Sequence, residues 1–67
     1  MHSEIGEAAG VIWRYLDGKG STSLRRLREA TELSEQLVYM GLGWLAREGL
    51  VTFEKEKRSL LVALRRP

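Results

Sequence analysis

The chain has 67 residues and a mass of 7.6 kDa, which suits one small domain and leaves no room for a second domain or a large enzyme cleft. Its 43% hydrophobic and 30% charged residues, with a net charge of +2, are typical of a folded globular protein and exclude a disordered or membrane-spanning chain. Cysteine is absent, and the only histidine, His2, adjoins Met1. We therefore expect one cytoplasmic domain over residues 1–67, without disulfides, thiolate metal sites or a secretory signal.

The first segment predicts an amphipathic helix over residues 3–17. Ser3 is a good N-cap residue, and Gly18 is a natural stop. Apolar residues recur at steps of three and four and so share one face: Ile5, Ala8 or Ala9, Ile12 and Leu16. The turn-forming residues 18–23 that follow allow a short strand at most.

Two serines predict the starts of two further helices. Ser23 precedes residues 24–31, in which the inward positions are Leu24, Leu27 and Ala30. Ser34 precedes a helix from residue 35 to about residue 48, which Gly49 ends. Two helices joined this closely form a helix-turn-helix.

After these helices the hydrophobic period changes from 3.6 to 2 residues, which predicts a strand hairpin. Residues 50–54 and 59–64 read as strands on either side of residues 55–58. Because this joint lacks Gly and Asn, we expect a four-residue loop built on a type I turn. The order helix, short strand, helix, helix, strand, strand is that of an α+β winged helix-turn-helix, whose C-terminal hairpin is the wing.

Two blocks carry a resemblance to known families. The block over residues 33–38 is similar to the joint of a helix-turn-helix, and residues 42–51 look like the end of a recognition helix entering its wing in many small transcription regulators. More narrowly, residues 39–49 resemble a family of short stand-alone prokaryotic winged-helix proteins of unestablished function. The resemblance covers essentially the whole chain and implies the fold more strongly than the function.

The basic residues favour a regulator-like protein that binds duplex DNA. The resemblance places base-reading positions at Glu35, Gln36, Met40 and Gly43, of which Gln36 suits adenine and Glu35 suits cytosine, with Arg47 as a flanking contact. Phosphate contacts are predicted at the wing, the second helix and the tail, by Lys55, Lys57, Arg58, Arg25, Arg26, Arg28, Arg65 and Arg66. Solvated surface is the alternative for the same charges, with Glu29 and Glu32 as partners of the helix arginines.

The third helix also favours a rival hypothesis, in which the domain forms a homodimer or docks a protein partner without binding DNA. Val38, Leu42 and Leu45 form the stripe that the domain's own core needs. Beyond that stripe lie further apolar residues, and the predicted protein interface consists of Leu37, Tyr39, Met40 and Trp44. In this hypothesis Gly41 or Gly43 lets another backbone approach closely. The alternative is that Leu37 and Trp44 widen the intramolecular core. We expect Trp13 at the rim of the core, with a place in a second exposed patch as the alternative.

No constellation of side chains predicts catalysis. Residues 18–21 resemble part of a phosphate loop, but that motif needs a glycine where Trp13 stands and a strand before it. Glu54 and Glu56 lie in or beside the wing loop, where nothing would desolvate a carboxylate for general acid or base work. We therefore expect no enzymatic activity, no cofactor, no metal and no small-molecule substrate.

Overall fold

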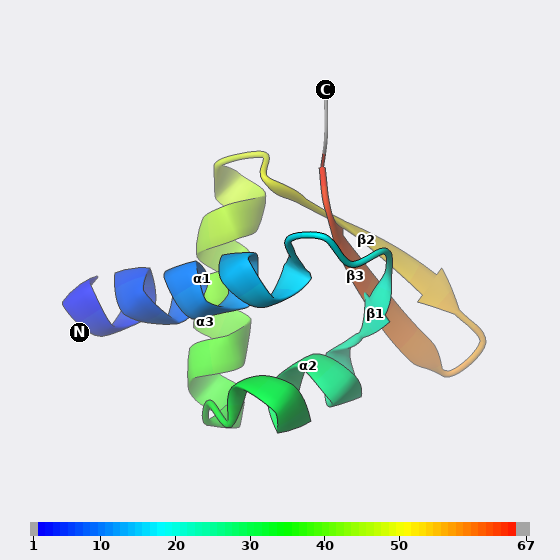
Figure 1. Cartoon of the computed structure of the whole chain (residues 1–67), viewed down its shortest axis with the longest axis horizontal. Coiled ribbons are helices and arrows are strands. Elements are labelled where there is room, and N and C mark those ends of the chain that lie inside the picture. Colours follow the sequence, from blue (N-terminus) through cyan, green and yellow to red (C-terminus); the bar gives the residue numbers. More distant parts are fainter. Residues whose placement is uncertain (1, 66–67) are drawn as a thin grey trace.

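A computed structural model describes the backbone of residues 2–65 and the side chains of residues 4–65. Its elements follow the predicted order: α1 (His2–Leu16), β1 (Thr22–Ser23), α2 (Leu24–Thr31), α3 (Glu35–Arg47), β2 (Val51–Glu56) and β3 (Ser59–Leu64). In Figure 1, α1 crosses α3, α2 lies at one end of α3, and the β2–β3 hairpin extends to the side. The predicted α+β winged-helix fold is confirmed.

The three strands form an antiparallel sheet in the order β1-β3-β2. In the hairpin Val51 pairs with Leu64 at one end and Glu56 with Ser59 at the other. The turn therefore contains only Lys57 and Arg58, and Lys57 is left-handed with φ 52°. The predicted four-residue loop is wrong because strand pairing continues to the last residue before a tight turn, even though no Gly or Asn supplies the positive φ.

Both predicted serine caps of the helix-turn-helix are confirmed. The Ser23 side chain accepts a hydrogen bond from the Arg26 backbone N–H (3.1 Å), and Ser34 accepts one from the Leu37 N–H (3.2 Å). The predicted cap at Ser3 is wrong, since the helical backbone of α1 begins at His2. Glycines 18 and 49, with φ of +82° and +71°, follow α1 and α3 as predicted.

The core lies where α1 and α3 cross and the sheet closes over them. Its buried residues include the predicted stripe of α3 and the inward face of α1: Ala9, Ile12, Leu16, Leu27, Val38, Leu42, Leu45, Val51 and Val62. Ala30, predicted to point inward, is exposed. Thr31 takes the inner position of that last turn, half-buried with its hydroxyl donating to the Leu27 carbonyl (2.8 Å).

The crossing of α1 and α3 depends on Gly41. A Cβ at this position would lie 2.9 Å from Ile12 Cδ1 and 3.2 Å from the Ala9 backbone nitrogen. The close approach predicted for Gly41 therefore occurs, but the approaching backbone is α1 of the same chain and not that of a partner. A Cβ on Gly43, in contrast, would meet nothing within 4 Å.

Candidate nucleic-acid interface

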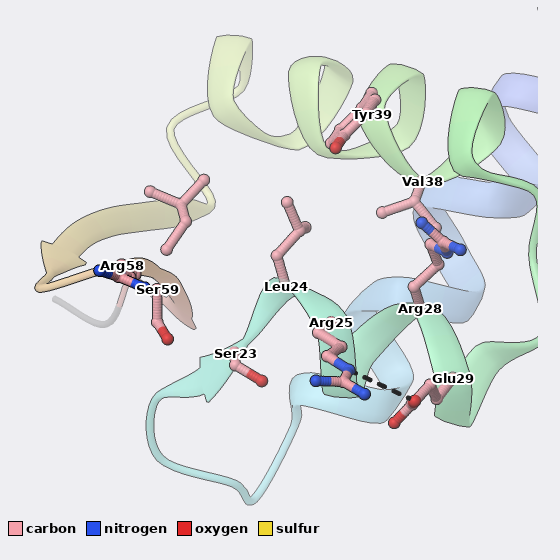
Figure 2. A pocket seen from close by; sticks show the side chains of 10 residues that line it. Ser23, Leu24, Arg25, Arg28, Glu29, Val38, Tyr39, Arg58 and Ser59 are labelled. Carbon is pink, nitrogen blue, oxygen red and sulfur yellow. Dashed lines mark ion pairs between the residues drawn. The ribbon is translucent and has the colours of Figure 1, made fainter.

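A groove of about 570 Å³ lies between α2, the first half of α3 and the tip of the wing. Its lining combines an apolar floor with basic groups: Leu24, Val38 and Leu60 lie with Ser23, Arg25, Arg28, Glu29, Tyr39, Arg58 and Ser59. Figure 2 shows these side chains on their elements: Tyr39 lies on α3, Arg25 and Arg28 lie on α2, and Arg58 lies at the turn of the wing. Three of the predicted phosphate contacts thus line one hollow, two from α2 and one from the turn of the wing.

Two of these arginines already face carboxylates. Arg25 Nε lies 3.7 Å from Glu29 Oε2, and Arg28 Nη1 lies 3.3 Å from Glu35 Oε2. All four side chains are more than half exposed. Such exposed pairs contribute about 0–1 kcal/mol and are screened by salt, so a phosphate group can replace the carboxylate. The ion pair with Arg28 also engages Glu35, which was predicted from the sequence as a contact to cytosine.

The wing separates its charges by face. Residues that pair across antiparallel strands share a face, and successive residues alternate between faces. Lys55, paired with Leu60, lies on the face that carries the buried Val62 and looks toward the helices. Glu54 and Glu56 lie on the opposite face. From the wing, Arg58, Ser59 and Leu60 line the groove, and no carboxylate of β2 lines it.

The outward face of α3 is a stripe of four residues. Gln36, Met40, Gly43 and Arg47 follow one another at steps of four, three and four, and all are exposed. No carboxylate stands in this stripe. At about 100° per residue, Tyr39 lies on the flank toward the wing groove, and Trp44 lies on the flank toward α1.

Other predicted contacts lie elsewhere. Arg26 lines a separate hollow with Tyr15, Lys19, Ser21, Thr22 and Ser23, in which Lys19 Nζ sits 4.7 Å from the centre of the Tyr15 ring. Arg65 is exposed beyond β3, and its backbone N–H donates to the Leu50 carbonyl (2.8 Å). Arg66 lies outside the described residues.

The four residues predicted as a protein interface do not line one hollow. Leu37 is half-buried and lines a hollow beside the first turns of α1. Tyr39, 53% exposed, faces the wing groove, whereas Trp44, 43% exposed, faces a different groove beside Trp13. Met40 points outward between them. The helical spacing predicted that these residues lie outside the core stripe of α3 but not which neighbouring element each would face.

Sequence reasoning missed the apolar floor of the wing groove. Leu60 was predicted only as a strand residue, yet it is 38% exposed and lines the groove together with Arg58. Leu24 was predicted as core and is half-buried at the same floor. The period-2 pattern carries the relevant signal, because it places Leu60 on the face of Val62 and Lys55.

Among the described residues, no three His, Cys, Asp or Glu side chains gather as metal ligands. The described helices also include none of sufficient length and apolar character to cross a lipid bilayer.

Comparison with known proteins agrees with this architecture. The chain is 30% identical to the uncharacterised protein MJ1608 of Methanocaldococcus jannaschii, covering 97% of this chain and 96% of the relative. The solution NMR structure of BT2368 from Bacteroides thetaiotaomicron matches with a TM-score of 0.82 and 27% identity, over 92% of this chain and 76% of that one. A HOP2 structure, described by its DNA recognition and protein interaction domains, matches with a TM-score of 0.70 over 87% of this chain and 98% of that one; at 24% identity this shows the fold alone. A family model for winged helix-turn-helix domains, DUF2582, matches residues 1–64, and the chain belongs to this family.

Proposed function

We propose that this protein binds duplex DNA through the outward face of α3 and the groove between α2, α3 and the wing. The observation that carries the proposal is that Arg25, Arg28 and Arg58 all line that groove, while no carboxylate of β2 does. Arginine clusters that follow one face of a small domain are typical of phosphate recognition.

In this arrangement α3 lies in the major groove. Gln36, near the N-terminus of the helix, donates to and accepts from an adenine edge, and Met40 offers an apolar contact to a thymine methyl group. Arg47, at the far end of the same stripe, contacts a phosphate. Gly43 between them leaves room for the DNA backbone or base edges to come close.

The wing and α2 then hold the phosphates on either side. Lys55, Lys57 and Arg58 reach the backbone beside the major groove, and Arg25 and Arg28 contact the backbone next to α2 after exchanging their carboxylate partners for phosphates. Because most of these contacts are to phosphate, the affinity arises mainly from counterion release and falls steeply with salt. The proposal gives Arg26 no contact, since it lies in the other hollow.

The experiment is a fluorescence anisotropy titration of a short mixed-sequence duplex at about 50 mM and about 150 mM salt, a range over which phosphate-dominated binding weakens strongly. Arg58→Glu combined with Arg25→Glu is expected to raise the dissociation constant by at least about 10-fold at the lower salt and to flatten the salt dependence.

Arg26→Glu is the matched control, since it makes the same charge change on α2 outside the groove. It is expected to alter the affinity much less than Arg25→Glu alone. Equal losses of affinity for Arg25→Glu and Arg26→Glu would mean that only the net charge of the protein matters. Undiminished binding by the double variant would show that the DNA does not bind at the proposed site.

A further inference from the structure

A second groove, of about 440 Å³, lies between α1 and the C-terminal half of α3. Its lining is apolar or small except for one arginine: Gly6, Ala9, Gly10, Trp13, Arg14, Trp44, Leu45 and Leu50. Trp13, Trp44 and Leu50 are 38%, 43% and 41% exposed. Three large apolar side chains thus remain partly in water on one side of a 67-residue domain, and they offer a surface that a partner can cover.

The two glycines of this groove have no role inside the fold. Gly6 and Gly10 lie one turn apart on α1, and a Cβ added to either would meet nothing within 4 Å. A glycine inside a helix lowers its stability relative to alanine. Together with Trp13, which follows Gly6 by seven residues on the same face, they form a shallow notch beside a protruding ring.

The charges beside the notch indicate which partner is complementary to it. Glu7 and Arg14 are also seven residues apart, on one flank of α1, and both are exposed. Neither has an ion pair or side-chain hydrogen bond with any other residue in the part of the chain that the structure describes. A surface with a ring and a notch on one helix face, and with opposite charges two turns apart, is complementary to itself under a twofold axis.

We propose that a second copy of this chain docks on the groove, with the two α1 helices packed antiparallel. The twofold axis passes between the two α1 helices near Gly10 of each copy and brings Glu7 of each copy opposite Arg14 of the other. Because helical side chains lean toward the N-terminus, Trp13 of each copy then lies over the Gly6–Gly10 notch of the other. Trp44 and Leu50 close the sides of the contact.

The exposed area predicts a weak, reversible dimer. A fully exposed aromatic side chain presents about 150–250 Å², so the two partly exposed tryptophans and Leu50 supply only a few hundred Å² of apolar surface from each copy. With their glycine and charged neighbours, the two copies bury about 1,000 Å², at the lower limit for a specific interface. We expect a dissociation constant in the micromolar range, roughly 10–100 µM.

The proposed dimer leaves the wing groove accessible. Trp44 and Tyr39 lie about 140° apart around α3, so the two grooves occupy opposite flanks of that helix. Self-association is therefore independent of DNA binding, and its test needs no DNA.

The test is sedimentation equilibrium of four proteins over a range of concentrations up to about 1 mM, well above the expected dissociation constant. The wild type is expected to shift from monomer to dimer. Arg14→Glu places like charges opposite each other at both symmetric positions and should raise the dissociation constant by about 10-fold. The double variant Glu7→Arg with Arg14→Glu restores opposite charges and should recover most of the wild-type association. Arg26→Glu, which makes the same charge change outside this groove, should associate as the wild type does.

A wild type that stays monomeric at 1 mM would overturn the proposal, as would a double variant that associates no better than Arg14→Glu. A second measurement locates the contact: isotope-filtered NOEs in a mixture of labelled and unlabelled protein. The proposal predicts intermolecular NOEs between the Trp13 ring and the Hα protons of Gly6 and Gly10. Intermolecular NOEs confined to Met40 and Tyr39, or to the free edge of β2, would contradict it.

Discussion

The clearest stability prediction concerns two glycines of the same helix. Gly41 and Gly43 both lie inside α3, so replacing either with alanine gains the same intrinsic helix propensity, about 1 kcal/mol. Their surroundings differ. At Gly43 the new methyl group enters open space, and Gly43→Ala should therefore stabilise the domain by up to about 1 kcal/mol.

At Gly41 the new methyl group meets α1. Ordinary van der Waals contact begins at 3.4 Å, yet Ile12 Cδ1 would lie at 2.9 Å and the Ala9 backbone nitrogen at 3.2 Å. Ile12 is fully buried and cannot swing aside, and the Ala9 nitrogen belongs to the helix backbone, so α1 must move away from α3. Overpacking of this kind costs about 1–3 kcal/mol.

The difference between the two variants isolates this steric cost, because the propensity gain cancels. Gly41→Ala should be about 1–3 kcal/mol less stable than Gly43→Ala, which corresponds to about 5–20 °C in Tm for a domain of this size. Thermal and urea denaturation followed by far-UV circular dichroism measure both values. If Gly41→Ala proved as stable as Gly43→Ala, the close crossing of α1 and α3 would be wrong.

Three further predictions follow from single contacts. Ser34→Ala leaves the Leu37 N–H without its cap and should cost about 1 kcal/mol by urea denaturation; no loss would contradict the capping role. Leu27→Ala empties a fully buried site and should cost about 2–5 kcal/mol, enough to leave a domain this small largely unfolded by circular dichroism, so a native spectrum and melting temperature would refute the burial. Glu35→Gln releases Arg28 from its 3.3 Å partner and should tighten duplex binding several-fold at low salt, while weaker binding would argue against Arg28 as a phosphate contact.

Local chemistry explains why most of the fold could be predicted from the sequence. Ser23 and Ser34 cap helices through their own side chains, and Gly49 supplies the positive φ at the end of α3, so each signal acts within a few residues. The change of hydrophobic period after Gly49 likewise predicts the strand hairpin of the wing directly. The turn of the wing was mispredicted because Lys57 adopts a left-handed backbone that its side chain does not favour.

The candidate site was less predictable because it depends on how the helices are rotated about their axes. Arg25, Arg26 and Arg28 look alike in sequence, but the burial of Leu27 fixes the rotation of α2 and turns Arg26 away from the groove. In the same way, the packing of α3 on α1 sends Tyr39 and Trp44 to opposite flanks. Such rotations are set by tertiary contacts, which spacing along the chain does not specify.

The most direct test of DNA binding at this site is an NMR titration of the labelled protein with a short mixed-sequence duplex, first at low and then at physiological salt. DNA binding at this site predicts amide shift changes at Gln36, Arg47 and residues 55–58 that diminish as salt is added, while Tyr15, Lys19 and Ser21 in the separate hollow of Arg26 change little. An absence of shifts at low salt, where electrostatic attraction is strongest, would contradict DNA binding. Shifts centred on α1 and Trp44 instead of the wing groove would contradict the proposed site.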